Sequence, residues 1–330
     1  MKLPLLTTLV LLLFSTALVA EDAHDPKKAY LDAAEAGTEF ALQGEYAGSF
    51  KTDDGEVKIG VQVIAEGQNK LVWVAYIGGL PGDGWDGNTP MRGAGEIQGD
   101  KGILQGDAGR GEIKDGSLVI FTADNDRVGE ISKTTRVSST IGRKPPEDAV
   151  VLFDGTTDHH FNGGRMSDDK LLMQGVTSRE KFPSCELHLE FMLSFMPNAR
   201  GQGRSNSGCY LQGRYEVQML DSFGLTGENN ECGGIYTIKK PSVNMCYPPL
   251  SWQTYDIEYH AAKFDSDGKK MADAWMTVKH NGVTIHDEVK LPHATTAAPV
   301  AEGPEPGPLH LQDHGNPVRY RNIWIKPLAE

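Results

Sequence analysis

Basic side chains are scarce in this chain of 330 residues, where 32 Lys and Arg stand against 45 Asp and Glu and the formal net charge is −13. A surface that binds nucleic acid needs an excess of positive charge. The composition therefore argues against nucleic acid as a partner and gives no information about a neutral ligand such as a small carbohydrate.

Cysteine is also scarce, with four residues in the chain. No two of them have the spacing of a metal-binding C-x-x-C pair. Cys185 and Cys209 lie within apolar runs and are predicted to be small buried side chains. Cys232 and Cys246 bracket a loop rich in Gly, Pro and Asn, and we expect these two to form a disulfide if the protein is exported.

Long hydrophobic runs are missing after the first twenty residues. The one such run, Leu3–Val19, is followed by Ala20 and then by acidic Glu21 and Asp22. This pattern predicts a signal peptide over 1–20, too short for a membrane span, and hence export to the periplasm or the extracellular space. No later segment approaches 18 apolar residues, so the sequence predicts no membrane span.

Helical periodicity is weak as well. Within the N-terminal segment 21–43, a short helix is expected from Lys27 to Leu42, because Asp25 and Pro26 resemble an N-cap followed by the first helical position. From Gly44 onward the sequence consists of short β-type runs separated by glycine-rich turns.

The β-type runs fall into two groups. Residues 44–143 are predicted to form a small accessory antiparallel domain of about six to eight strands. The polar, Pro-rich segment 144–149 serves as a linker. Residues 150–330 contain short strands at steady spacing, which predicts a two-sheet antiparallel sandwich. The predicted fold class is therefore all-β.

One segment of the second domain, residues 205–224, can be placed on a hairpin in a single register. A loop of Gln212, Gly213 and Arg214 pairs Leu211 with Tyr215, and the register continues two residues at a time to Cys209 with Val217 and Ser207 with Met219. A slip by one residue would bury the acidic side of the hairpin. The opposite face then carries Asn206, Gly208, Tyr210, Glu216 and Gln218.

Strict alternation beyond Met219 would place Leu220 on the polar face and Asp221 in the core. A β-bulge near Met219 and Leu220 would correct both and turn the Asp221 carboxylate toward Glu216. A carboxylate pair on a sheet face indicates a sugar site. The alternative is an amphipathic strand with one wet side.

Several motifs in the second domain occur in an order that resembles the 3-keto-disaccharide hydrolase family, also described as 3-keto-glucoside 1,2-lyases and 3-keto-2-hydroxyglucal hydratases. The resemblance covers residues 150–328. It implies a concanavalin A-like jelly-roll sandwich that acts on oxidised glucosides outside the cytoplasm. The motifs are Leu152-Phe-Asp-Gly155, Asn206-Ser-Gly208, Tyr215-Glu-Val-Gln-Met-Leu-Asp221, Gly233-Gly-Ile-Tyr236, Trp252-Gln-Thr-Tyr-Asp-Ile257, His280-Asn-Gly282 and the run from Leu311 to Trp324.

A sugar oxidised at C3 has an acidified proton on C2, so its cleavage needs a base, a stabiliser of the enediolate oxygen and a proton donor for the leaving group. Glu216 or Asp221 could be the base, its pKa raised by the acidic neighbour. His314 could donate the proton or, with a carboxylate, hold a divalent metal ion that polarises the ketone. No compact ligand spacing demands such an ion, so no cofactor is predicted with certainty.

The predicted substrate-binding residues are polar side chains of the hairpin and of the carboxy-terminal motif. On the latter, His310, Gln312 and His314 alternate with leucines, and an even-length loop would bring two arginines onto the same face. The set comprises Asn206, Tyr210, Arg214, Gln218, Gln312, Asp313, Arg319 and Arg321.

The sequence also allows two other functions. A non-catalytic carbohydrate-binding module could use the same sandwich. A conventional glycoside hydrolase is the second, because Glu216, Gln218 and Asp221 have the spacing of the Glu-x-Asp-x-x-Glu strand of laminarinase-type enzymes. Here an amide replaces the middle acid and a shorter Asp the last Glu, which weakens a double displacement that needs two carboxyls about 5–5.5 Å apart.

Overall fold

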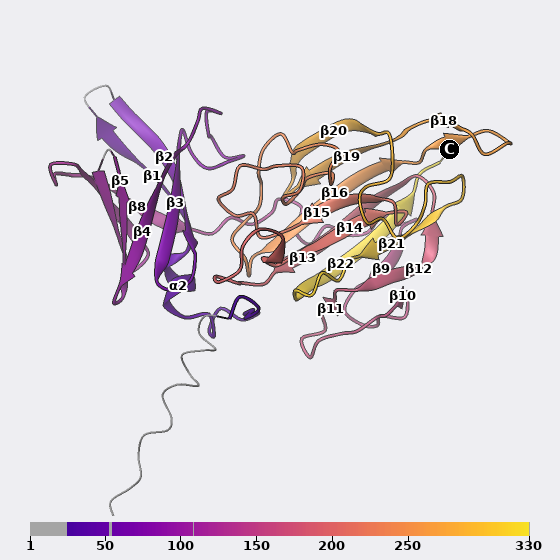
Figure 1. Ribbon diagram of the computed structural model, residues 1–330, viewed down its shortest axis with the longest axis horizontal. Helices are drawn as coiled ribbons and strands as arrows, with labels where there is room; N and C mark the ends of the chain where they lie inside the picture. The colour runs from indigo at the N-terminus through magenta and orange to yellow at the C-terminus, as the bar shows by residue number, and fades with distance from the viewer. Residues whose placement is uncertain (1–24, 53–54, 108, 330) are drawn as a thin grey trace, which may run out of the picture.

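The computed structural model describes residues 25–52, 55–107 and 109–329. Within them the chain forms a β-barrel followed by a larger β-sandwich (Figure 1). The prediction of an all-β protein, with a small antiparallel domain ahead of a two-sheet domain, is confirmed. The predicted signal peptide, 1–20, lies outside the described residues. In the part of the chain that the structure describes, no helix is both long and apolar enough to pass through a bilayer.

The barrel contains eight described strands, each antiparallel to the next, and β1 pairs with β8 to close it. Turns such as Asp115-Gly116, with φ of 50° and 79°, join neighbouring strands as tight hairpins. Alternate side chains point inward, as on β2, where Val61 and Val63 are buried. The strands are β1 Gly44–Thr52, β2 Gly55–Ala65, β3 Lys70–Ile77, β4 Met91–Gln98, β5 Lys101–Gly106, β6 Gly109–Lys114, β7 Ser117–Thr122 and β8 Arg127–Thr134.

The helix expected over Lys27–Leu42 is mostly wrong, because only α2, Gly37–Leu42, is helical. Gly37 has a φ of 68°, in the left-handed region, so a right-handed helix cannot continue through it from earlier residues. Asp25 does accept a hydrogen bond from the Lys27 amide at 2.8 Å, but the bond closes a turn rather than capping a helix. Leu42 is buried against the end of the barrel, where its carbonyl accepts from the Tyr46 hydroxyl.

The sandwich has a five-stranded sheet in the order β10-β12-β21-β14-β15. It also has a seven-stranded sheet in the order β11-β22-β13-β16-β19-β20, with β9 paired to β22, and a separate β17–β18 ribbon. Apolar residues of both sheets form one core between them. The strands are β9 Val150–Phe153, β10 Phe161–Asn162, β11 Leu172–Met173, β12 Val176–Phe182, β13 Cys185–Leu193, β14 Ser207–Leu211, β15 Tyr215–Met219, β16 Trp252–His260, β17 Lys263–Phe264, β18 Lys270–Ala272, β19 Ala274–His280, β20 Val283–Leu291, β21 Gly307–Leu311 and β22 Val318–Pro327.

The predicted hairpin register is confirmed by β14 and β15, where Leu211 faces Tyr215 and the pairing continues in the predicted steps. Cys209 and Val217 belong to the core between the sheets. Because side chains alternate along a strand, Tyr210 and Glu216, which also face each other, lie on the outer side of the five-stranded sheet.

The predicted bulge after Met219 is wrong. The strand ends at Met219, and both Leu220 and Asp221 are buried. The Asp221 carboxylate turns to the Arg204 guanidinium, with an Oδ2–Nε distance of 2.7 Å, and not to Glu216. Arg204 also donates to the carbonyl of Ala65 at the end of β2, so this ion pair helps to fasten the barrel to the sandwich.

The disulfide predicted between Cys232 and Cys246 is also wrong, since both are free, buried thiols. The Cys232 sulfur lies 3.4 Å from the Tyr255 hydroxyl, and the Cys246 thiol donates to the carbonyls of Leu220 and Tyr247. The two thiols are hydrogen-bonding neighbours in the packed core, but no bond joins their sulfurs. Cys185 and Cys209 are buried, as predicted.

Candidate active site

The outer face of the β14–β15 hairpin forms the floor of a small polar cavity of about 90 Å³. The walls come from loops before β14, after β15, before β21 and after β21. A volume below the roughly 300–1,000 Å³ of ordinary small-molecule sites fits only the reacting part of a sugar. The lining residues are Gln202, Asn206, Tyr210, Glu216, Gln218, Tyr236, Thr296, Ala297, Gln312 and His314.

Glu216 is the acidic group of this lining and is only 3% exposed. Burial raises its pKa from 4.5 to about 7, and a hydrogen bond from the Tyr210 hydroxyl at 2.8 Å opposes the rise. Gly208 makes room for the carboxyl, because a Cβ at this position would collide with Glu216 Oε1. The site thus holds a carboxyl group that changes its charge near neutral pH.

Tyr210 links Glu216 to the carboxy-terminal wall of the cavity. Its hydroxyl receives a hydrogen bond from Gln312 Nε2 at 3.3 Å and donates to Glu216 Oε2. Burial and the Glu216 carboxylate raise the pKa of Tyr210, so its hydroxyl keeps its proton. Tyr210 therefore fixes the orientation of the acid as a permanent donor.

Asn206 contributes an acceptor that has no partner among the described residues. Its Nδ2 donates to the carbonyl and to Oε1 of Gln202, at 2.8 and 3.1 Å, whereas its buried Oδ1 is unpaired there. Gln218 Nε2 donates to the same Gln202 Oε1 at 3.0 Å. A buried acceptor is costly to leave unpaired, and a ligand hydroxyl at this wall of the cavity would satisfy it.

His314 follows β21 and lines the same cavity with an exposed side chain. The structure therefore brings together six predicted site residues: Asn206, Tyr210, Glu216, Gln218, Gln312 and His314. His310 lies outside the lining, and its Nδ1 is 2.9 Å from the Thr177 hydroxyl.

Three other predicted site residues near this sheet have different partners. Asp221 is held by Arg204, as described above. Arg214 donates from Nε to the carbonyl of Ala301 at 2.8 Å and so fastens a neighbouring loop to the hairpin turn. Asp313 accepts from the Gly315 amide and lies 4.0 Å from Arg165. None of the three is part of the cavity lining.

The expectation that Arg319 and Arg321 share the face of His314 is wrong. Both lie on β22, in the seven-stranded sheet, and alternate there with Tyr320, which belongs to the core. Their side chains therefore point away from the five-stranded sheet. Arg321 donates to Glu190 at 2.6 Å and stacks on Trp252, and Arg319 donates to Gln174 at 3.3 Å.

Four lining residues were not predicted: Gln202, Tyr236, Thr296 and Ala297. Tyr236 could have been found, because it ends the Gly233-Gly-Ile-Tyr236 motif. Thr296 and Ala297 carry no sequence signal. Their loop reaches the site because the neighbouring Thr295 hydroxyl accepts from the Glu216 amide at 3.0 Å and donates to the Arg214 carbonyl.

The described residues do not provide a set of ligands for the divalent metal ion that was considered from the sequence. Among the described residues, no three His, Cys, Asp or Glu side chains gather closely enough to hold a metal ion. The cavity offers one carboxylate, Glu216, and one imidazole, His314. These two groups alone do not make up the donor set of a divalent metal ion.

The raised pKa of Glu216 predicts how the stability of the folded protein depends on pH. Between pH 4.5 and about 7 the folded protein keeps a proton that the unfolded chain has released, so the free energy of unfolding falls as the pH rises through this window. Each pH unit in this window lowers the free energy of unfolding by about 1.36 kcal/mol, so the total loss at pH 8 is on the order of 3 kcal/mol. Glu216→Gln carries no such cost, so its stability relative to wild type should rise by that amount between pH 4.5 and 8.

Denaturant unfolding of both proteins at several pH values measures this difference. A difference that does not change with pH would show that Glu216 titrates as an ordinary surface carboxyl.

Residues 148–326 match the profile of the 3-keto-alpha-glucoside-1,2-lyase-like domain. A crystal structure from Parabacteroides distasonis, named as a putative glycosyl hydrolase, is 30% identical, with a TM-score of 0.50 over 56% of this chain and 85% of its own. No curated protein matches the chain.

Two further structures from the same organism carry the same name. They are 17% and 19% identical, with TM-scores of 0.41 and 0.39. They cover 56% and 55% of this chain and 95% and 99% of their own.

Proposed function

This chain belongs to the 3-keto-alpha-glucoside-1,2-lyase-like family and is a carbohydrate-active enzyme, and we propose that it cleaves 3-keto-glucosides or 3-keto-disaccharides by elimination followed by hydration. The observation that carries the proposal is the buried Glu216 carboxyl, with a pKa of about 7, on the floor of a polar cavity. A proton acceptor of this strength suits the removal of a proton beside a ketone.

The first step is removal of the C2 proton by the Glu216 carboxylate. The electron pair of the C2–H bond forms the enediolate, with negative charge on the C3 oxygen. Tyr210 donates a hydrogen bond to Glu216 and holds it in place during the transfer. The amide of Gln312, which lines the same cavity and gives one of its two Nε2 hydrogens to Tyr210, is the proposed donor to the developing oxyanion.

The second step breaks the C1–O bond. The electrons of the enediolate return to form a C1–C2 double bond, and the departing oxygen takes a proton from His314 at the open side of the cavity. Water then adds across the resulting enone, with hydroxide at C1 and a proton at C2, so the net reaction is hydrolysis. Asn206 Oδ1 is the proposed acceptor for a sugar hydroxyl.

A conventional glycoside hydrolase is the second candidate, because the solved structure that is 30% identical to this chain is named as a glycosyl hydrolase. A double displacement needs two carboxyl groups about 5–5.5 Å apart on either side of the scissile bond. Among the described residues that line the cavity, Glu216 is the one acid. This favours proton abstraction from an oxidised sugar over displacement at C1.

The deciding experiment incubates the purified protein with 3-keto-trehalose, with a 3-keto-glucoside and with the unoxidised parents. Turnover of the keto sugars alone supports the proposal. Turnover of the parents would establish a conventional hydrolase, and binding without turnover would establish a non-catalytic module.

We also propose that the enzyme acts outside the cytoplasm, from the apolar run Leu3–Val19 and the acidic residues that follow it. Amino-terminal sequencing of the protein recovered from the producing cells tests this. A mature protein that begins near residue 21 supports export, and one that retains residues 1–20 contradicts it.

A further inference from the structure

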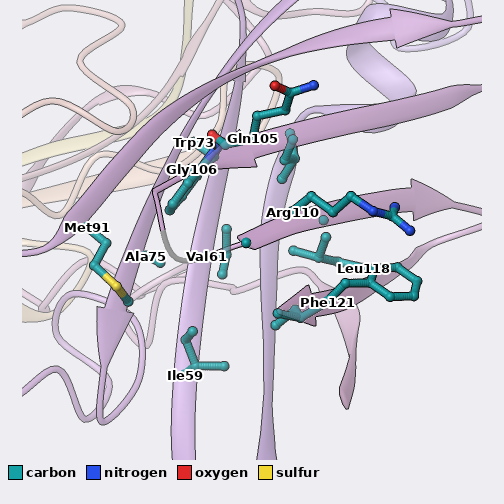
Figure 2. A pocket seen from close by; sticks show the side chains of 14 residues that line it. Ile59, Val61, Trp73, Ala75, Met91, Gln105, Gly106, Arg110, Leu118 and Phe121 are labelled. Atoms are coloured by element: carbon teal, nitrogen blue, oxygen red, sulfur yellow. Dashed lines mark hydrogen bonds between the residues drawn. The ribbon is translucent and has the colours of Figure 1, made fainter. Parts of the chain in front are cut away.

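The barrel has a second cavity, of about 140 Å³, that no part of the proposed reaction uses. It lies inside the barrel, where Val61 on β2, Trp73 and Ala75 on β3 and Leu118 on β7 face the same hollow (Figure 2). The lining residues are apolar apart from Gln105 and Arg110, which belong to strands β5 and β6. An apolar hollow of this size binds water poorly.

The two ends of the barrel differ. At one end Ala36 and Leu42, together with Phe195 from the sandwich, pack into the barrel core and close it. The cavity lies toward the other end, where Met91 at the start of β4 is 43% exposed. A small molecule therefore has a route into the barrel from the side of Met91.

The wall of the cavity is built so that Trp73 lies along it and does not fill it. Trp73 Nε1 donates to the carbonyl of Gln105 at 2.9 Å, which holds the indole against β5. A Cβ at Gly93 or at Gly106 would come within 2.6 Å of the indole ring. Ordinary residues at these two glycines would push the ring into the hollow.

An empty cavity lowers the stability of a fold in proportion to its volume. Here the two glycines and the Gln105 hydrogen bond maintain the hollow, although the large indole beside it could occupy the space. That arrangement is expected of a binding site rather than of a packing defect.

The charge at the rim indicates what kind of molecule fits. Arg110 forms an ion pair with Glu112 at 2.5 Å and donates to Asn125 from two nitrogens, and its guanidinium stacks on Phe121 at 3.9 Å. Its charge is thus already matched by a carboxylate, so an anionic ligand would find no free partner in Arg110. Apolar walls and a paired cation favour a neutral molecule.

We propose that the barrel binds a small neutral aromatic or aliphatic molecule in this cavity. A hollow of about 150 Å³ lined by aliphatic and aromatic side chains is large enough for benzene. The barrel cavity is close to that size, so its ligand has about the dimensions of benzene or toluene. This proposal is independent of the reaction assigned to the sandwich.

The test uses the full chain and toluene as the probe, with the melting temperature and tryptophan fluorescence as readouts. At about ten times the dissociation constant, toluene should raise the Tm of wild type by about 3 °C. Ala75→Leu fills the hollow with three carbon atoms and should weaken toluene binding at least tenfold. Ala94→Leu is the matched control, because Ala94 is exposed on β4 and should keep the wild-type response.

If Ala75→Leu is not recovered as a folded protein, Val61→Leu replaces it, since this change adds one methylene to the same lining. Loss of the toluene response in the filled variant and its retention in Ala94→Leu support the site. A wild-type protein that shows no response, or a filled variant that responds as wild type does, overturns the proposal.

Discussion

Glu216→Gln is expected to lower kcat/KM for a 3-keto-glucoside by about 100-fold to 10,000-fold. Glutamine keeps the shape of the side chain and can still accept a hydrogen bond from Tyr210, but it cannot take up the C2 proton. Steady-state kinetics on the purified variant measures the loss. Circular dichroism and the melting temperature establish that the fold is intact.

Glu305→Gln is the matched control, because it makes the same chemical change at an exposed residue outside the cavity. It should retain the wild-type rate. A Glu216→Gln protein that also retained it would remove this carboxylate from the mechanism and with it the proposed proton abstraction.

Arg204→Met is expected to lower the free energy of unfolding by about 3–5 kcal/mol, because removal of one partner from a buried ion pair leaves the other charge without compensation. Arg204 and Asp221 are 5% and 4% exposed, and their side chains meet at 2.7 Å. Denaturant unfolding measures the loss. Arg127→Met breaks the exposed ion pair with Glu130 and should cost at most about 1 kcal/mol.

The same ion pair decides the role of Asp221. Asp221→Asn should also be destabilised, and the fraction that folds should keep its rate on a keto sugar, since the cavity lining does not include this residue. If Asp221→Asn were as stable as wild type but inactive, Asp221 would return to the mechanism as a catalytic acid or base.

The β14–β15 hairpin shows how much of the fold and the site can be predicted from the sequence. Its alternation of apolar and polar residues admits one register, because a slip by one residue would exchange the two faces. The structure has this register, and the residues on its polar face include Tyr210, Glu216 and Gln218 of the cavity. The carboxy-terminal motif supplied Gln312 and His314 to the same cavity.

The alternation of inward and outward side chains did not predict the position of residues that lie beyond the end of a strand. Asp221 lies two residues beyond the end of β15, and its partner Arg204 precedes β14. Neither strand pattern nor spacing indicates that these two meet. For Arg319 and Arg321 the alternation held, but the strand that carries them lies in the other sheet, so the shared face was assigned to the wrong side of the sandwich.

By itself the sequence determined the all-β class, the family, the hairpin register and the acid and imidazole of the cavity, because short-range alternation and local motifs carry this information. Only the tertiary structure decided that burial raises the pKa of Glu216 to about 7 and that Asp221 pairs with Arg204. It also decided that the barrel has a cavity beside Trp73. These outcomes depend on burial and on contacts between segments far apart in the chain, and a local pattern contains neither.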